Sequence, residues 1–260
     1  MLPASFARDG FLPPDQLRKG KLRRLMVGTD GWPNTGKTEF ALSAPGPGIV
    51  ICLDRGFESM LDNPHPPVTR RSDFAFKVIT VPLPTQLKQP EYVEHWRAFY
   101  SEYLKALANP DARTVVLDGD SDSWELQRLA EFGRTLQVPS LQYANVNNAR
   151  KAMISRAWDS GKIFISTNKL SDGYETKLDK DNKATQVKTG KEKRQGFNDW
   201  GYLYSVQLRH LYHEGQFGVR ILMCKSDTSL QGLELWGEDC NFKSLVQTIY
   251  PQIPLNEWGY

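Results

Sequence analysis

A group of glycines, a lysine and a threonine near the start of the chain has the spacing of a loop that binds phosphate. The segment GWPNTGKT, residues 31–38, fits the pattern G-x-x-x-x-G-K-[ST]. Gly31 and Gly36 let the backbone curl and turn its N–H groups inward, where a side chain would block the phosphates. Lys37 would reach the β- and γ-phosphates, and Thr38 would offer its hydroxyl to Mg²⁺. The predicted nucleotide-binding residues are Gly31, Trp32, Pro33, Asn34, Thr35, Gly36, Lys37, Thr38 and Glu39.

The residues on either side of this segment favour a strand before it and a helix after it. Residues 25–27 form a short apolar run typical of a buried strand, and residues 40–42 supply an apolar face. Strand, glycine-rich loop and helix is the order in which phosphate loops occur. A helix that begins near Lys37 would point its positive end at the same anion. An ordinary Gly/Pro turn is the alternative interpretation.

A second candidate residue ends an apolar run in the middle of the chain. The segment TVVLD, residues 114–118, predicts a buried strand that ends at Asp118. Beside a phosphate loop, a carboxylate in this position can hold Mg²⁺, often through water. We therefore predict that Thr38 and Asp118 bind the metal together. Asp120 and Asp122 follow at once, and their alternative role is to cap and charge the first turn of the next helix.

Hydrophobic periodicity predicts strands and helices in alternation. The continuous apolar run GIVICLD, residues 48–54, suits a central parallel strand that is buried on both faces. Further strands are expected at 76–83 and 163–167, and helices at 91–108, 124–136 and 143–158. Thr167, Asn168 and Lys169 stand at the tip of the strand at 163–167. Polar side chains there would lie level with a γ-phosphate, or they merely mark a strand that turns into a loop.

The last third of the chain is predicted to be β. Strands at 203–212 and 217–224 are separated by His-Glu-Gly-Gln, a hairpin turn, and segments 232–239 and 242–250 close the domain. His210 and His213 are three residues apart, so on a strand they face opposite ways. This spacing argues against a metal ion shared by the two histidines.

The segment from Leu170 to Phe197 has a different character, with few apolar residues. Residues 169–195 hold eight basic and five acidic side chains, a net charge of 8 − 5 = +3. We expect a basic loop here. Basic residues beside aromatic ones suit single-stranded nucleic acid, with lysines on the phosphates and rings on the bases. The alternative is a solvated hairpin whose mixed charges keep it soluble. Replacing Lys188, Lys191, Lys193 and Arg194 with Ser would distinguish a DNA-binding loop from a solvated hairpin.

Composition limits the class of protein. The chain has 260 residues, 40% hydrophobic and 24% charged, which is enough for one large α/β domain. Its net charge of +3 carries no global attraction to nucleic acid. Three cysteines without a C-x-x-C pair predict reduced thiols in a reducing compartment. No apolar run approaches the length of a secretion signal or a membrane span, so we expect a cytoplasmic protein without a membrane partner.

The order of these segments resembles the RecA-type ATPase core. The sequence GWPNTGKT is followed by ICLD, TVVLDGDSDSW, IFISTN, a basic segment and a terminal β hairpin. More narrowly, the chain is similar to single-domain phage P-loop ATPases grouped with RecA-like, Sak-type single-strand annealing proteins. The resemblance covers about residues 22–245. It implies a mostly parallel central sheet flanked by helices, in a domain at 22–250 that is followed by a tail at 251–260. Residues 1–21 are predicted to be an N-terminal arm because their prolines prevent a long helix; the arm is either a loose terminus or a segment that docks on a neighbouring subunit.

The resemblance also implies roles for particular residues. RecA-type proteins carry a catalytic Glu just past the strand that ICLD occupies here, and Glu58 is the corresponding carboxylate, although it stands later than expected. Asp54 and Asp120 are the alternatives for orienting the attacking water. Lys225 would reach the γ-phosphate of a neighbouring subunit, with Arg220 as the second choice, so a homo-oligomer is implied. The implied activity is Mg²⁺-dependent ATP hydrolysis coupled to single-stranded DNA in recombination or replication, in the host cytoplasm.

Two other classes share the phosphate loop. A small-molecule or nucleoside kinase would need a lid with several arginines, whereas the basic segment here is rich in lysine and has one arginine. A nucleotide-binding structural or assembly protein would bind ATP without useful turnover. Phosphate release measured with and without single-stranded DNA separates the three.

Overall fold

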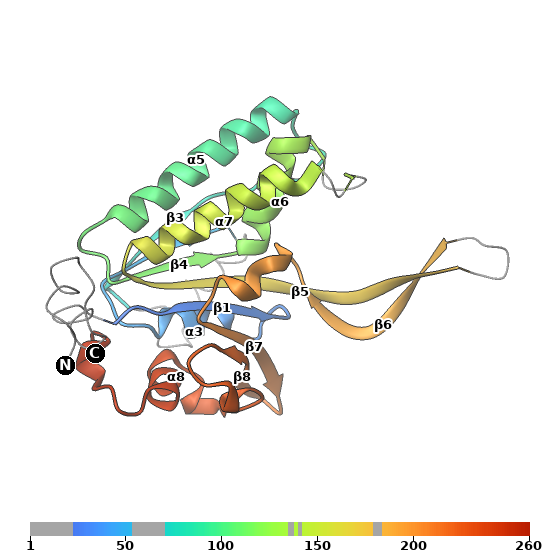
Figure 1. Ribbon diagram of the computed structural model, residues 1–260. Coiled ribbons are helices and arrows are strands. Elements are labelled where there is room, and N and C mark those ends of the chain that lie inside the picture. The colour runs from blue at the N-terminus through green and yellow to red at the C-terminus, as the bar shows by residue number, and fades with distance from the viewer. Residues whose placement is uncertain (1–22, 54–70, 135–137, 140–141, 179–183) are drawn as a thin grey trace, which may run out of the picture.

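The computed structural model describes residues 23–53, 71–134, 138–139, 142–178 and 184–260. The described strands form one sheet in the order β3-β2-β4-β5-β1-β7-β8-β9, and β6 pairs with β5 (Figure 1). The strands are β1 (Met26–Gly31), β2 (Gly48–Cys52), β3 (Phe74–Val78), β4 (Thr114–Asp118), β5 (Ile163–Leu178), β6 (Ala184–Arg194), β7 (Val206–His213), β8 (Gln216–Cys224) and β9 (Glu234–Trp236). The helices are α3 (Lys37–Leu42), α5 (Gln89–Ala108), α6 (Asp120–Phe132), α7 (Tyr143–Asp159) and α8 (Phe242–Ile249). The predicted arm at 1–21, Asp54 and Glu58 lie outside the described residues.

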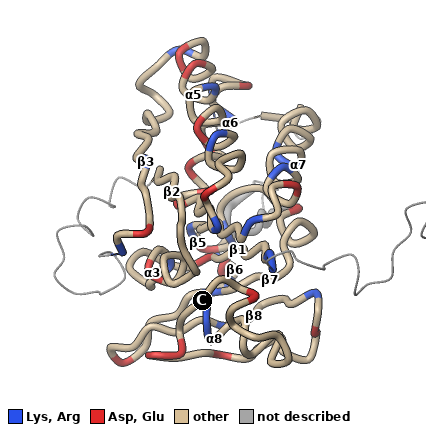
Figure 2. The backbone as a smooth tube through the Cα atoms, turned by 90° about the vertical axis from the view of Figure 1, so that its left-hand side faces the viewer, with Lys and Arg blue, Asp and Glu red and all other residues tan. Residues whose placement is uncertain are grey.

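The centre of the sheet is parallel and buried on both faces. β1 and β4 are completely buried along their lengths, as expected for apolar strands covered by helices on each side. Successive side chains alternate between the two faces. Met26 packs with α5, α6 and α7, whereas Val27 packs with α3 and α8. Figures 1 and 2 show these two helical layers on opposite sides of the sheet. The predicted α/β class with a mostly parallel sheet is therefore confirmed.

The strand order brings distant residues to one edge of the sheet. β5 lies between β1 and β4 and is parallel to both, with Thr29 opposite Thr167 and Leu117 opposite Ser166. The carboxyl ends of β1 and β4 therefore lie on either side of β5 near residues 166–169. β7 lies on the other side of β1 and is also parallel to it. We call this side of the sheet the phosphate-loop edge, because the loop that the sequence predicts to bind phosphate begins there after Gly31.

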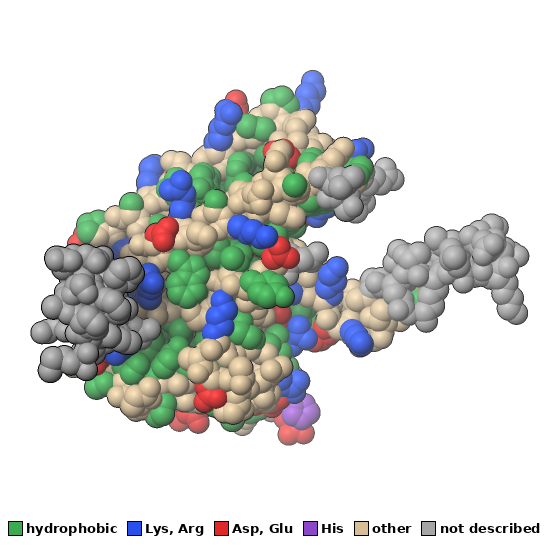
Figure 3. Space-filling model, viewed as in Figure 1, with side chains coloured by type: hydrophobic (Ala, Val, Ile, Leu, Met, Phe, Trp, Pro, Cys, Tyr) green, Lys and Arg blue, Asp and Glu red, His purple; other side chains and the backbone are tan. Residues whose placement is uncertain are grey.

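The segment from Leu170 to Phe197 is mostly a two-stranded ribbon rather than an irregular loop. β5 continues past the body of the sheet and pairs antiparallel with β6, from Leu170 opposite Arg194 to Leu178 opposite Ala184. Figure 1 shows the ribbon projecting from the domain, and Figure 3 shows Lys and Arg side chains at its base. The expected loop is therefore a β hairpin in the structure. Backbone pairing across the ribbon satisfies the polar groups that an isolated polar segment would leave to water.

The end of the chain differs from the all-β prediction. β7 and β8 form the expected antiparallel hairpin, and β9 adds a short third strand. Residues 242–249, predicted as part of the β region, are the helix α8, so that prediction is wrong. Its buried residues Phe242, Leu245, Val246 and Ile249 have helical spacing. The Asn241 side chain caps the helix by accepting a hydrogen bond from the backbone N–H of Ser244.

Three smaller expectations can be compared with the structure. β3 begins and ends earlier than the predicted strand at 76–83, and α6 begins earlier than 124–136 because Gly119 is its N-cap. All three cysteines carry free thiols, and those of Cys52 and Cys224 are buried. Among the described helices, none combines the length and the apolar character that crossing a bilayer requires.

Candidate functional site

The loop between β1 and α3 depends on its glycines for close approach and for backbone angle. A Cβ atom on Gly31 would lie 2.6 Å from Thr35 Oγ1 and 2.9 Å from His210 Cβ, so only glycine fits there. Gly36 has a φ of 81° and Asn34 a φ of 59°, both in the left-handed region. The tight packing around Gly31 is a reason for glycine that the motif itself does not reveal.

The Lys37 side chain folds back over the loop that precedes it. Its ammonium nitrogen donates to the carbonyl oxygens of Gly31 at 3.0 Å and Trp32 at 2.6 Å. Thr35 Oγ1 donates to the same Trp32 carbonyl at 2.8 Å. The positive charge is therefore already placed in the curl of the loop. Partial burial also raises the pKa of the neighbouring Glu39 carboxyl.

Thr38 and Asp118, predicted to bind one metal ion, are in direct contact. Thr38 Oγ1 donates to Asp118 at 2.9 Å from Oδ2 and 3.1 Å from Oδ1. Thr167 Oγ1, on β5 opposite Thr29 of β1, donates to Asp118 Oδ1 at 2.6 Å and accepts a hydrogen bond from the Gly119 backbone N–H. The Asp118 carboxylate is thus oriented by two hydroxyl groups from neighbouring elements, and its side chain is nearly inaccessible to solvent.

The donor set at this point fits Mg²⁺. A hydroxyl and a carboxylate are hard oxygen ligands, and Mg²⁺ usually adds phosphate oxygens and waters to one or two carboxylates. Among the described residues, no group of three or more His, Cys, Asp or Glu side chains could hold a metal ion by itself. A magnesium ion on Thr38 and Asp118 would need further ligands, such as phosphate oxygens or water. His210 is buried and His213 is exposed, which agrees with the prediction that the two face opposite ways on the strand.

Asn168 and Lys169, expected at the tip of a strand, lie within the longer β5 and have separate surroundings. Lys169 donates to Asp122 Oδ1 at 2.7 Å, which ties the strand to the start of α6. Asn168 is buried, and its amide nitrogen has no hydrogen-bond partner among the described residues. A buried amide without a partner is costly to leave unsatisfied. The Asn168 amide could therefore donate a hydrogen bond to a bound group.

Asp120, an alternative for orienting water, belongs to a buried network. Its carboxylate pairs with the fully buried Arg150, which also donates to Ser123 Oγ at 2.8 Å. Trp200 Nε1 donates to the other carboxylate oxygen at 3.3 Å. Both oxygens of Asp120 are therefore engaged in holding α6, α7 and the turn after β6 together. The candidates Glu58 and Asp54 lie outside the described residues.

The two cations considered for the γ-phosphate lie at different places on β8. In the sheet, Arg220 of β8 lies opposite Arg209 of β7, and Arg209 lies opposite Asp30 of β1. Arg220 is therefore level with the start of the loop. It forms an ion pair with Glu234. Lys225 follows Cys224, which is opposite Val206 at the beginning of β7. At about 3.4 Å per residue, Lys225 is roughly 15 Å further from the loop. Its ammonium donates to the Tyr202 carbonyl at 2.8 Å.

A chain of polar contacts connects the loop to the ribbon, and no sequence pattern indicated it. Trp32 Nε1 donates to Glu192 of β6, and Arg209 donates to the other oxygen of Glu192 at 2.9 Å. Arg209 also donates to the buried Asp30 at 2.9 Å, one residue before the loop. The same region holds His210, which is completely buried. Burial, and then the positive charge of Lys37, lowers the pKa of its imidazole to about 3.

Comparison with known proteins adds no assignment. Neither the protein-family models nor the curated proteins include a match to this chain. Function is therefore inferred from the residues and their geometry.

Proposed function

We propose that this protein is a RecA-like P-loop ATPase that binds ATP with Mg²⁺ and hydrolyses it. The observation that carries the proposal is the 2.9 Å contact between the Thr38 hydroxyl and Asp118. A glycine-rich motif can occur by chance, but here a carboxylate from 80 positions away meets the motif's hydroxyl. Both groups are oxygen ligands of the kind that Mg²⁺ prefers. The parallel sheet, with the loop and Asp118 at the same edge, further supports the proposal.

Lys37, Thr38 and Asp118 have separate tasks in this mechanism. Lys37 would exchange its bonds to the Gly31 and Trp32 carbonyls for bonds to β- and γ-phosphate oxygens. Thr38 and Asp118 would hold the metal ion, which neutralises the β- and γ-phosphate oxygens when it is bound. Water would attack the γ-phosphorus in line, the bond to the β–γ bridging oxygen would break, and ADP and phosphate would leave. Glu58, or Asp54 in its place, would accept the proton of the water.

The direct test is binding of a fluorescent ATP analogue with and without Mg²⁺. Lys37→Ala should weaken binding at least tenfold, about 1.4 kcal/mol, in both conditions because the charge on the phosphates is removed. Asp118→Asn should weaken it only when Mg²⁺ is present. Lys243→Ala, at an exposed position on α8, is the matched control and should bind normally. Unchanged ATP affinity in a folded Lys37→Ala protein would contradict the phosphate-loop assignment.

The ribbon favours single-stranded DNA as the partner of this ATPase. It carries exposed lysines, among them Lys191 and Lys193, on a two-stranded projection that begins at the phosphate-loop edge. Arg194 differs from them, because its guanidinium lies 3.8 Å from the centre of the Trp200 ring and donates to the Phe197 carbonyl. We therefore assign Arg194 to the packing of the ribbon base and leave the lysines to bind phosphates.

Phosphate release separates this proposal from its competitors. Release that rises on addition of single-stranded DNA supports a DNA-dependent ATPase, as the resemblance to phage recombination proteins implies. Release that depends on a small-molecule acceptor would indicate a kinase. Binding without release would indicate a nucleotide-binding assembly protein. Each result contradicts the other two.

Lys225 enters the proposal as a group supplied to a neighbouring subunit. Its distance from the loop of its own chain fits action in trans, where a cation can contribute several kcal/mol to phosphoryl transfer. Lys225→Ala should bind ATP and lose turnover, and mixing it with Lys37→Ala should restore part of the activity. Arg220→Ala tests the second choice in the same assay. Normal hydrolysis by Lys225→Ala, or full activity of a monomer at every concentration, would remove the inter-subunit mechanism.

A further inference from the structure

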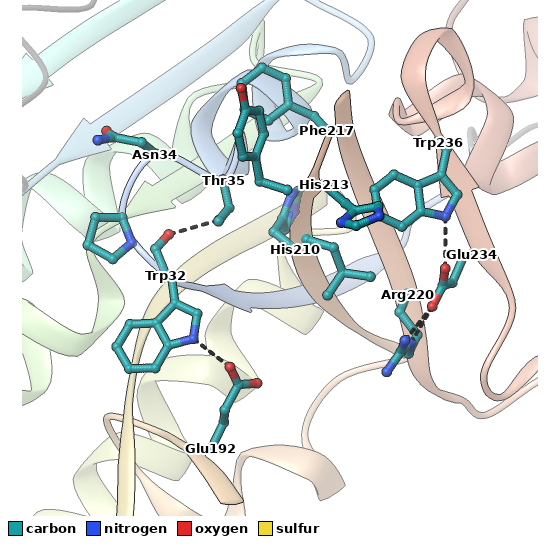
Figure 4. A pocket seen from close by; sticks show the side chains of 13 residues that line it. Trp32, Asn34, Thr35, Glu192, His210, His213, Phe217, Arg220, Glu234 and Trp236 are labelled. Carbon is teal, nitrogen blue, oxygen red and sulfur yellow. Dashed lines mark hydrogen bonds and ion pairs between the residues drawn. The ribbon is translucent and has the colours of Figure 1, made fainter. Parts of the chain in front are cut away.

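A cavity of about 860 Å³ opens beside the phosphate loop. Loop residues 32–35 form one wall, and the β7–β8 hairpin with Glu234 and Trp236 forms the others (Figure 4). The volume lies within the range of sites that enclose a small organic ligand. Loop residues 32–35 are part of the wall, so the cavity adjoins the loop in which the phosphates would lie.

Aromatic rings dominate the cavity wall. Tyr212 is 56% exposed and Phe217 is 37% exposed, and their ring centres are 5.1 Å apart. The Phe217 ring lies 3.2 Å from the position that a Cβ atom on Gly36 would occupy, so the aromatic surface begins at the loop. Figure 4 shows Trp32 and Trp236 on opposite sides of the pocket. Large rings left in contact with water at one place commonly mark a surface that a ligand covers.

Trp236 is held in position before any ligand arrives. A Cβ atom on Gly218 would lie 2.4 Å from its ring, so the indole rests directly on the backbone of β8. Its Nε1 donates to Glu234 at 2.8 Å, and Glu234 accepts a hydrogen bond from Arg220 at 2.6 Å. An aromatic side chain fixed in this way loses little conformational entropy on binding.

The charged groups of the wall are already paired. Glu192 accepts hydrogen bonds from Trp32 and Arg209, and Glu234 is bonded to Arg220. These charged groups are therefore already engaged and do not provide hydrogen bonds to the edge of a planar ligand. The cavity is built for the flat face of a ring rather than for the hydrogen-bonding pattern of one particular base.

We propose that this cavity binds the nucleobase of the nucleoside triphosphate whose phosphates occupy the loop, and that it does so by stacking with little discrimination between bases. The inference rests on the proposed function, since it requires phosphates in the loop. Stacking on aromatic side chains tolerates any base because each has a π face. ATP and GTP should therefore bind with similar affinity, and both should bind more tightly than a triphosphate without a base.

The test compares ATP, GTP and inorganic tripolyphosphate by calorimetry on the full chain with Mg²⁺. ATP and GTP should agree within a few fold, and each should exceed tripolyphosphate by about tenfold, the scale of a single aromatic stack. Tyr212→Ser and Trp236→Leu should lower the affinity for ATP and GTP and leave that for tripolyphosphate unchanged. Tyr202→Ser removes a tyrosine that is 85% exposed near Lys225 and should change none of the three.

The outcomes distinguish the two proposals. Equal affinities of the wild-type protein for ATP and tripolyphosphate would overturn the base cavity and leave the phosphate loop intact. Variants that lose ATP and tripolyphosphate in the same proportion would also overturn it. Binding of neither ligand would overturn the proposed function itself. Trp236→Leu alters a ring that packs on β8, so Tyr212→Ser, at a solvent-exposed position, decides the matter if Trp236→Leu does not fold.

Discussion

The phosphate-loop edge and the ribbon adjoin each other but satisfy their charges in different ways. At the edge, the Asp120–Arg150 pair has side chains that are 4% and 0% exposed. On the ribbon, the Asp172–Lys188 pair has side chains that are 35% and 58% exposed. A buried charge must keep its partner, whereas an exposed charge can turn to water. The edge is therefore constrained by its own packing, and the ribbon is free to carry charge for another molecule.

Unfolding in urea should reveal this difference most clearly. Arg150→Met leaves the Asp120 carboxylate buried without its partner, so the free energy of unfolding should fall by about 3–5 kcal/mol. In the ribbon, Lys188→Met should lower the free energy of unfolding by less than about 1 kcal/mol, because the Asp172–Lys188 pair is exposed. The double variant Asp120→Asn with Arg150→Met should recover much of the loss. Equal costs at the two sites would break the comparison.

The buried histidine of the edge should make stability depend on pH. In the folded protein the pKa of His210 is lowered to about 3, while the unfolded chain takes up this proton near the ordinary value of about 6.5. The unfolded state therefore binds more protons between these values, and stability falls as the pH drops below about 6.5. Linkage gives a loss of about 2 kcal/mol at pH 5.

The measurement is the free energy of unfolding of the wild-type protein and His210→Phe at pH 7 and pH 5. The variant should lose less stability between the two values, because it has no imidazole at this position. His213→Phe, at an exposed position on the same strand, is the matched control. If His210→Phe and the wild-type protein lose the same amount, burial of a neutral His210 is not the cause.

Glu192 provides a way to test whether the two regions communicate. It belongs to the ribbon but bonds to Trp32 of the loop and to Arg209. If single-stranded DNA alters the ATP affinity of the wild-type protein, Glu192→Gln should reduce that coupling by about 1 kcal/mol, since couplings between sites are typically of this size. Glu214→Gln, in the β7–β8 turn, is the control. Coupling that survives in Glu192→Gln would show that this contact carries none of it.

The ribbon lysines should have the smallest and most selective effect. Replacing Lys191 and Lys193 with Ser should weaken single-stranded DNA binding several-fold and lower the salt slope by about 0.7 for each phosphate that the protein no longer neutralises. ATP affinity without DNA should stay the same, because neither lysine lines the phosphate loop. Affinity for DNA measured across a range of salt concentrations provides the comparison. A slope that does not change would leave the ribbon as a solvated hairpin.

The sequence alone determined the features that depend on local spacing. The loop at 31–38 needs glycines, a lysine and a threonine at fixed intervals, so eight consecutive residues specify it. The strand that ends at Asp118 can be predicted from the β-branched and apolar residues of the segment 114–118. Strand periodicity likewise predicts different environments for His210, which is buried, and His213, which is exposed. The apolar residues of α8 recur at intervals of three and four, which is a helical pattern, so the sequence also contained the information that the β prediction for this segment did not use.

Tertiary structure decided which distant groups meet. β5 lies between β1 and β4, and this order brings Thr167 to Asp118 from 49 residues away. Trp32 contacts Glu192, which is 160 residues away in the sequence. Asp120 forms an ion pair with Arg150 instead of facing solvent. Contacts of this range follow from the order and register of strands, which a pattern along the chain does not encode. The periodicity of the sequence indicates on which face of a strand a side chain lies, but only the assembled sheet determines which residue lies opposite it.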